Sequence, residues 1–135
     1  MKKNQIWLFL MKKHKKEVDS QKIAEVIVQG IQEKKGKDIV SLDLRKISSS
    51  VSDYFIICHA DSSTQVRAIA DSVEHEMDKV LNENLWHKEG QGNAEWILLD
   101  YVSVVVHIFK TDKREFYGVE ELWGDAQSQR FESAS

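Results

Sequence analysis

Aromatic and charged side chains crowd together in the last third of this 135-residue chain. Tryptophan, tyrosine and arginine dominate the energetics of protein–protein interfaces, so the crowding favours a surface that recognises another protein. The rings belong to Trp96, Tyr101, Phe109, Phe116, Tyr117 and Trp123, and Asp100, His107, Arg114, Glu120 and Glu121 lie between them. We expect Phe109, which follows a run of valines, to fill the core. Exposure and burial are equally open for Trp96, Tyr101, Tyr117 and Trp123.

Catalytic or metal chemistry is not indicated by the motifs of the chain. Gly90-x-Gly92 lacks the third glycine, the preceding strand and the following helix of a phosphate-binding loop. His75-Glu76 lacks the second histidine of a zinc-protease helix, and the five histidines, at 14, 59, 75, 87 and 107, show no ligand spacing. No G-x-S-x-G elbow surrounds the serines. The sequence therefore predicts neither an enzyme nor a bound cofactor.

One enzymatic alternative stays open. Asp43 and Asp100 end predicted strands and could hold Mg²⁺ in a nucleotidyltransferase-like enzyme. Phosphoryl transfer also needs phosphate-binding donors in fixed positions, and no basic or glycine-rich segment accompanies these two carboxylates. An enzyme is therefore the weaker hypothesis.

Charge is divided unevenly along the chain. Residues 1–18 carry six lysines against Glu17, whereas the other 117 residues carry 13 Lys and Arg against 21 Asp and Glu. An acidic body argues against direct binding to nucleic-acid phosphates and suits a basic protein partner, although it would also serve solubility alone. The basic leader leaves open a second alternative, an RNA-binding assembly factor that uses the lysine-rich leader as an electrostatic arm.

Cysteine usage and the N-terminal segment predict a cytoplasmic protein. Cys58 is the single cysteine and lies in an apolar run, which excludes a disulfide within the chain and indicates a small buried side chain in a reducing compartment. The apolar run at 6–10 is too short for a membrane span or a signal-peptide core. Either Met1 or Met11 could be the start of translation.

Hydrophobic periodicity predicts the order α-β-β-α-β-β-β-α. Three helices are predicted: one capped by Ser20 and ended by Gly36, one capped by residues 61–63, and a closing helix over 114–123. The predicted strands lie at 39–44, 54–59, 85–89, 95–100 and 102–109. The tight junction at Asp100-Tyr101 favours an antiparallel hairpin between the last two strands. The predicted fold is α/β in the α+β style, a single domain with a five-stranded mixed sheet and helices packed on it. Its boundaries are a basic extension at 1–18, a domain at 19–126 and a flexible polar tail at 127–135.

Three ordered segments resemble the ribosomal silencing factor (RsfS/Iojap) family. The first is Ser52-Asp53-Tyr54-Phe55-Ile56-Ile57 followed by Ser62-Ser63-x-Gln65-Val66-x-Ala68-Ile69-Ala70-Asp71. The second is Trp96-Ile97-Leu98-Leu99-Asp100-Tyr101 followed by Val104-Val105-Val106-His107-Ile108-Phe109. The third is Arg114-x-Phe116-Tyr117, then Glu120-x-Leu122-Trp123 and Asp125-Ala126. One departure is Val102-Ser103, where the family usually has Gly-Asp.

The resemblance implies a nucleotidyltransferase-like fold without the catalytic residues, and a homodimer when the protein is free. It implies docking on the large ribosomal subunit through ribosomal protein L-fourteen, which blocks joining of the subunits and represses translation when nutrients are scarce. Organellar relatives act in assembly of the large subunit. No cofactor, membrane or small-molecule substrate follows.

The resemblance and the hot-spot chemistry together predict the docking residues. Rigid aromatic rings supply contact area, and carboxylates suit a basic ribosomal protein. The predicted patch consists of Trp96, Asp100, Tyr101, Tyr117, Glu120 and Trp123, with His107 and Arg114 nearby.

Overall fold

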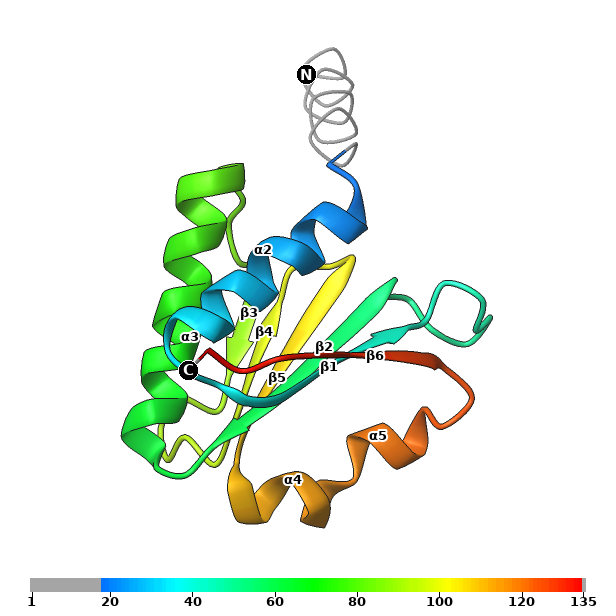
Figure 1. The fold of residues 1–135 in the computed structure, drawn as a ribbon. Helices are drawn as coiled ribbons and strands as arrows, with labels where there is room; N and C mark the ends of the chain where they lie inside the picture. The colour runs from blue at the N-terminus through cyan, green and yellow to red at the C-terminus, as the bar shows by residue number, and fades with distance from the viewer. Residues whose placement is uncertain (1–17, 135) are drawn as a thin grey trace, which may run out of the picture.

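A mixed sheet of six strands organises the protein, and the computed structural model describes residues 18–134 of it. The strands are β1 (Lys37–Asp43), β2 (Tyr54–Ala60), β3 (His87–Glu89), β4 (Trp96–Asp100), β5 (Val104–Lys110) and β6 (Gln127–Phe131). They lie side by side in the order β3-β4-β5-β2-β1-β6 (Figure 1). The central pair, β2 and β5, is parallel, and the other neighbours are antiparallel. The mixed character predicted from the sequence is confirmed.

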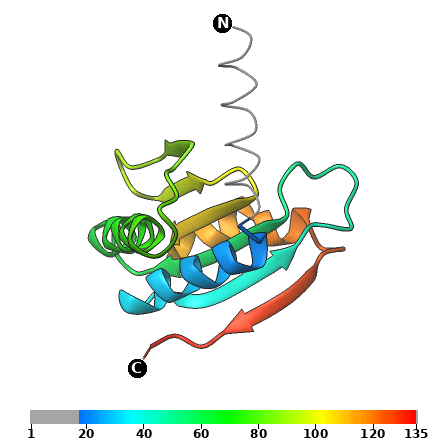
Figure 2. The same ribbon diagram turned by 90° about the horizontal axis from the view of Figure 1, so that it is seen from above.

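Helices pack on both faces of this sheet. Helix α2 (Ser20–Glu33) and helix α3 (Ser63–Glu76), which continues into the π-helical turn η1 (Met77–Leu81), cover one face. The short helices α4 (Thr111–Tyr117) and α5 (Val119–Leu122) lie on the other side, as Figure 2 shows. Within residues 18–134, no helix has the length and apolar character needed to span a membrane.

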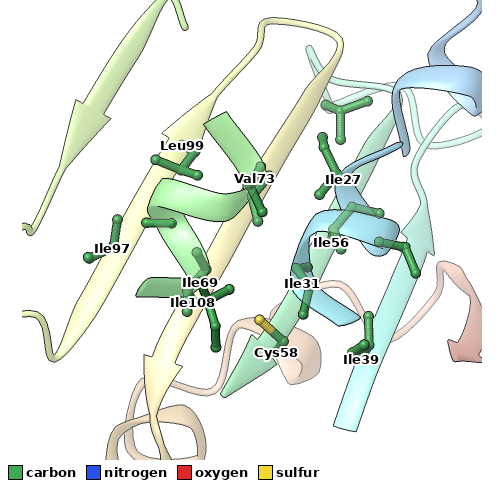
Figure 3. Close-up of a cluster of buried hydrophobic side chains, with 14 of the residues drawn as sticks. Ile27, Ile31, Ile39, Ile56, Cys58, Ile69, Val73, Ile97, Leu99 and Ile108 are labelled. Atoms are coloured by element: carbon green, nitrogen blue, oxygen red, sulfur yellow. The ribbon is translucent and has the colours of Figure 1, made fainter. Parts of the chain in front are cut away.

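The face beneath α2 and α3 holds the larger core. Ile27 and Ile31 of α2 and Ile69 and Val73 of α3 pack onto apolar residues of β2, β4 and β5 (Figure 3). Cys58 lies in this core with no exposed surface, and burial raises the pKa of its thiol to about 12. The interpretation of Cys58 as a small buried side chain is therefore confirmed.

The helix ends differ in detail from the prediction. Asp19, rather than Ser20, caps α2, because its carboxylate accepts a hydrogen bond from the Gln21 amide at 3.1 Å. Lys35 adopts the left-handed conformation after α2, with φ of 59°. Gly36 is required for another reason, since a Cβ there would lie 2.3 Å from Cγ2 of Ile31. Ser62 caps α3 as expected.

The predicted count of five strands is wrong, because part of the predicted polar tail forms a sixth strand. Residues 127–131 form β6, which pairs antiparallel with β1 from Asp43–Gln127 to Ile39–Phe131. This strand satisfies backbone groups at the edge of β1, and only Phe131 of its side chains is partly buried. The predicted closing helix is also divided, because Gly118 adopts φ of 59° between α4 and α5. The predicted basic extension lies outside the described residues, apart from Val18.

The hairpin between β4 and β5 is confirmed, but its turn contains a strained residue. The Tyr101 amide donates to the Val104 carbonyl at 2.9 Å, and the Ser103 amide donates to the Tyr101 carbonyl at 3.0 Å. Val102 between them has φ of 73°, a conformation that disfavours a β-branched side chain. Glycine, which the resembled family usually has at this position, would adopt the same conformation without strain.

We predict that Val102→Gly raises the free energy of unfolding by about 1 kcal/mol, because relief of backbone strain outweighs the greater flexibility of the unfolded chain. Val102 is 47% exposed, so little packing is lost. Urea denaturation would measure the change. Val51→Gly is the matched control, since Val51 is 99% exposed and has no positive φ. The control should lower the stability slightly, and a loss of stability in both variants would contradict the strain argument.

A candidate protein-docking face

Alternation along the strands gathers aromatic side chains on the side of the sheet away from α2 and α3. Trp96 and Phe109 are register partners across β4 and β5, as are Leu98 and His107, and paired residues share a face. We call this surface the aromatic face, and it consists of Phe55, Trp96, Leu98, Asp100, His107 and Phe109 from the sheet, with Tyr117 and Trp123 from the α4–α5 segment.

Trp96 links the sheet to α4. Its ring centroid lies 4.9 Å from that of Phe109 and 4.7 Å from that of Tyr117. Trp96 is half-buried, and Tyr117 is 41% exposed. The two rings therefore contribute both to packing and to the accessible surface.

Trp123 extends the aromatic face toward β2. Its ring meets Phe55 edge-on at 5.6 Å, and Phe55 in turn meets His107 at 4.6 Å. Beyond these rings, Phe116 and Leu122 are 75% and 78% exposed. Large exposed apolar side chains that adjoin a patch of rings are typical of interaction surfaces.

His107 lies beneath these rings as a neutral imidazole. The Trp96 Nε1–H donates to His107 Nδ1 at 3.2 Å, so the ring proton of His107 resides on Nε2. Nε2 is buried and finds no hydrogen-bond partner among residues 18–134. Burial lowers the pKa of His107 to about 4. An unsatisfied buried donor costs about 1–3 kcal/mol, which makes this histidine a poor choice for packing alone.

Asp100 and Tyr101 are adjacent and point to opposite faces, as successive residues of an extended chain do. Asp100 is half-buried on the aromatic face, and its Oδ1 accepts from the Val102 amide at 2.7 Å. Tyr101 is only 8% exposed and packs in the core beneath α2 and α3. Burial raises the pKa of its phenol, whose oxygen has no hydrogen-bond partner in the described part of the chain. Tyr101, which the sequence analysis included in the predicted docking patch, is therefore a core residue.

Arg114 and Glu120 connect structural elements rather than standing free. Arg114 Nε donates to Glu120 Oε1 at 2.7 Å, while Nη1 lies 2.7 Å from the Asp38 carbonyl oxygen and 2.9 Å from His59 Nδ1. The Arg114 side chain is 11% exposed. Burial and the positive charge of Arg114 lower the pKa of His59. These contacts fix α4 and α5 against β1 and β2.

Two residues of the aromatic face, Phe55 and Leu98, were not singled out from the sequence. Leu98 alternates with Trp96 and Asp100, so the period of two in this strand could have identified it. Phe55 lies in a continuously apolar run, where alternation gives no indication of which face a side chain occupies. His87 and Glu89 adjoin this region from β3, as the partners of Asp100 and Leu98.

The two carboxylates of the enzymatic alternative do not form one site. Asp43 and Asp100 belong to β1 and β4, which are three strand spacings apart, or about 14 Å. Asp43 is also held by Arg45, whose Nε and Nη2 lie 3.0 and 2.8 Å from its two oxygens, and this contact lowers its pKa. In the described region, no group of three His, Cys, Asp or Glu side chains is arranged to hold a metal ion.

Comparison with known proteins identifies similar sequences over nearly the whole described region. The family model described as "Ribosomal silencing factor during starvation" matches residues 17–135. The ribosomal silencing factor RsfS of Halalkalibacterium halodurans is 38% identical over 118 residues, covering 85% of this chain and 97% of that protein. RsfS of Bacillus subtilis is 38% identical over 109 residues, covering 81% and 91%. The chloroplastic Iojap protein of Zea mays is 37% identical over 76 residues, covering 54% of this chain and 31% of that protein.

A solved structure agrees with the fold. The crystal structure of a protein from Chromobacterium violaceum superposes with a TM-score of 0.75 at 31% identity, covering 87% of this chain and 97% of that one. The arrangement of strands and helices described above is therefore similar to one seen in an experimental structure.

The low pKa of His107 predicts a loss of stability in mild acid. The ordinary pKa is 6.5 and the folded-state pKa is about 4, so the unfolded chain binds more protons than the folded protein between these values. The contribution of His107 is fully present above pH 6.5 and is lost as the pH falls toward 4. We expect the free energy of unfolding to fall by up to about 3 kcal/mol across this window, measured by denaturant titration at each pH.

His107→Leu provides the comparison, because it removes the titrating group and should flatten the pH dependence between 6.5 and 4. His59 has a lowered pKa as well and will leave a residual slope. His75→Gln, at an exposed position on α3, should retain the parent profile. An unchanged profile for His107→Leu would show that His107 does not cause the loss.

Proposed function

The chain belongs to the family of ribosomal silencing factors, and from this premise we propose that it docks on the large ribosomal subunit through ribosomal protein L-fourteen. Bound there, it sterically prevents the small subunit from joining and represses translation when nutrients are limiting. The names of its relatives describe silencing of ribosomes; the partner and the steric mechanism are our proposal.

The observation that carries this proposal is the aromatic face. Trp96, Tyr117 and Trp123 offer rigid apolar contact area, which is what interface hot spots require. Acidic residues lie on the aromatic face or next to Trp123 in the sequence, namely half-buried Asp100 and exposed Glu121 and Asp125, while Lys113 Nζ lies 5.4 Å from the Phe116 ring centroid. Apolar contact area with neighbouring carboxylates suits a basic protein, because complementary charge speeds the encounter and fixes the orientation.

The area that a stable interface needs indicates how far the docking surface must extend beyond the sheet. A stable complex buries about 800 Å² on each partner. The sheet over β3, β4 and β5 measures only roughly 14 by 17 Å, from the spacing of strands and the rise per residue, and all β5 side chains except Lys110 are buried. We therefore include α4 and α5, with Phe116 and Leu122, in the docking surface.

The proposed action is binding without catalysis. We infer that the protein works in the cytoplasm without a cofactor, a small-molecule substrate or a membrane. We also propose that it forms a homodimer when free, for which exposed Phe116 and Leu122 provide apolar surface. The basic residues at 1–18 could add a peripheral contact with ribosomal RNA, and binding that weakens steeply with salt when they are present would reveal it.

We predict that the purified protein co-sediments with isolated large subunits and not with small ones. Added before the subunits are mixed, it should reduce the light scattered by joined ribosomes in proportion to the occupied large subunits. Equal sedimentation with both subunits, or joining that proceeds normally at saturation, would contradict the proposed silencing mechanism.

Tyr117 and Tyr101 provide a matched pair of tyrosines for locating the docking surface. Tyr117→Ala should weaken binding to ribosomal protein L-fourteen by roughly thirtyfold, equivalent to about 2 kcal/mol, because an exposed aromatic contact is lost. Tyr101→Phe should bind normally and melt no lower than the parent, because the phenol oxygen forms no hydrogen bond within residues 18–134. Isothermal titration and thermal melting on both variants measure these effects. Normal binding by Tyr117→Ala would remove α4 from the proposed surface.

A further inference from the structure

A histidine at position 107 is unexpected from packing alone. Its neighbours along β5 are Val105, Val106, Ile108 and Phe109, and its own side chain is only 4% exposed. Burial leaves its Nε2–H without an acceptor in the described part of the protein. Buried polar groups in native proteins are nearly always paired, so an exception of this kind calls for an explanation.

The other ring nitrogen of His107, Nδ1, does have a partner, and this contact indicates a role for the histidine. An indole N–H can only donate, so the 3.2 Å contact from Trp96 Nε1 requires a lone pair on His107 Nδ1. The imidazole is itself held in place, since Phe55 meets it at 4.6 Å and Phe109 lies nearly parallel to it at an interplanar angle of 11°. His107 therefore presents a fixed acceptor to the Trp96 indole.

The hydrogen bond to His107 fixes the orientation of the Trp96 indole. Its contacts with Phe109 and Tyr117 are ring–ring contacts at 4.9 and 4.7 Å, which have no single preferred orientation. A hydrogen bond to Nε1 is directional and fixes the plane and the rotamer of the half-buried indole. A side chain already ordered before binding loses less conformational entropy when the partner arrives.

We infer that His107 is a positioning residue for docking, which orients the Trp96 indole through Nδ1 and makes no contact of its own with the partner. This inference rests on the proposed function, because Trp96 is taken as part of the docking surface. It also changes the expected role of His107, whose burial keeps the imidazole away from an incoming protein.

Two substitutions separate positioning from packing. His107→Leu fills the site with an apolar side chain and removes the acceptor, together with the unsatisfied Nε2–H. His107→Asn is smaller and leaves a void, but its Oδ1 lies close to the place of Nδ1 and retains an acceptor. The apolar variant should therefore be the more stable of the two, and the asparagine variant should dock more tightly.

The first experiment measures melting temperature and affinity for large subunits on the same samples. We expect His107→Leu to melt no lower than the parent while its affinity falls roughly five- to tenfold, the cost of ordering one large side chain. His107→Asn should melt lower than His107→Leu yet recover most of the affinity. A merely structural histidine would give affinities that follow the melting temperatures, and that result would overturn the inference.

The second experiment needs no ribosome. Hydrogen exchange of the Trp96 indole N–H is followed by NMR, with the resonance assigned by its loss in Trp96→Phe. Exchange should be slow in the parent and in His107→Asn, and fast in His107→Leu. Slow exchange in His107→Leu would overturn the positioning role. If the parent shows the expected exchange but does not bind large subunits, the docking function fails while the hydrogen bond stands. If the parent binds and His107→Leu binds equally well, the function stands and the inference fails.

Discussion

The parallel pairing of β2 with β5 is the constraint on which the rest of the molecule depends. It runs in register from Tyr54–Val104 to Ala60–Lys110 and brings together segments that are far apart in the sequence. Parallel neighbours require a long crossover, which here contains α3, η1, β3 and β4, and parallel strands usually have apolar side chains on both faces that need cover. One face is closed by α2 and α3, and the other is closed partly by α4 and α5. The incomplete cover leaves the rings of Phe55 on β2 and Trp96 on β4 half-buried.

The two faces of the sheet consequently have different chemistry. Beneath α2 and α3 the contacts are almost entirely aliphatic, which maximises burial and dispersion. Each face holds one buried polar atom without a partner in the described part of the chain, the Tyr101 hydroxyl on the first and His107 Nε2 on the second. The second face differs in that it adjoins exposed Phe116 and Leu122, which serve recognition better than stability.

Sequence patterns predicted the features that depend on local periodicity and missed those that depend on partners distant in the chain. The stripe of Ile23, Val26, Ile27 and Ile31 identified α2, and the tight junction at Asp100-Tyr101 identified the β4–β5 hairpin. Strand β6 was not predicted, because an edge strand with polar side chains has no hydrophobic alternation. Its pairing with β1 depends on backbone hydrogen bonds, which leave no pattern in the sequence. Tyr101 was misplaced although the period of two assigns it to the core face with Ile97 and Leu99, because the chemistry of its ring was given more weight than the alternation. Likewise, spacing alone could not show that Arg114 contacts Glu120, Asp38 and His59.

Arg114 holds the α4–α5 segment in a fixed position against the sheet, so that the separate parts of the recognition surface stay together. Helix α4 has seven residues and α5 has four, too short to be stable by themselves. Arg114 joins both helices to the sheet through a carboxylate, a backbone carbonyl and an imidazole, all within 2.9 Å. Charge-assisted hydrogen bonds are directional, so they determine where Tyr117 stands relative to Trp96 more precisely than apolar contact would. The same division holds in the sheet, where the Trp96–His107 hydrogen bond sets the orientation of a ring that is already packed. On the aromatic face, hydrophobic contact therefore brings the rings together, and a few buried polar contacts determine the arrangement they adopt.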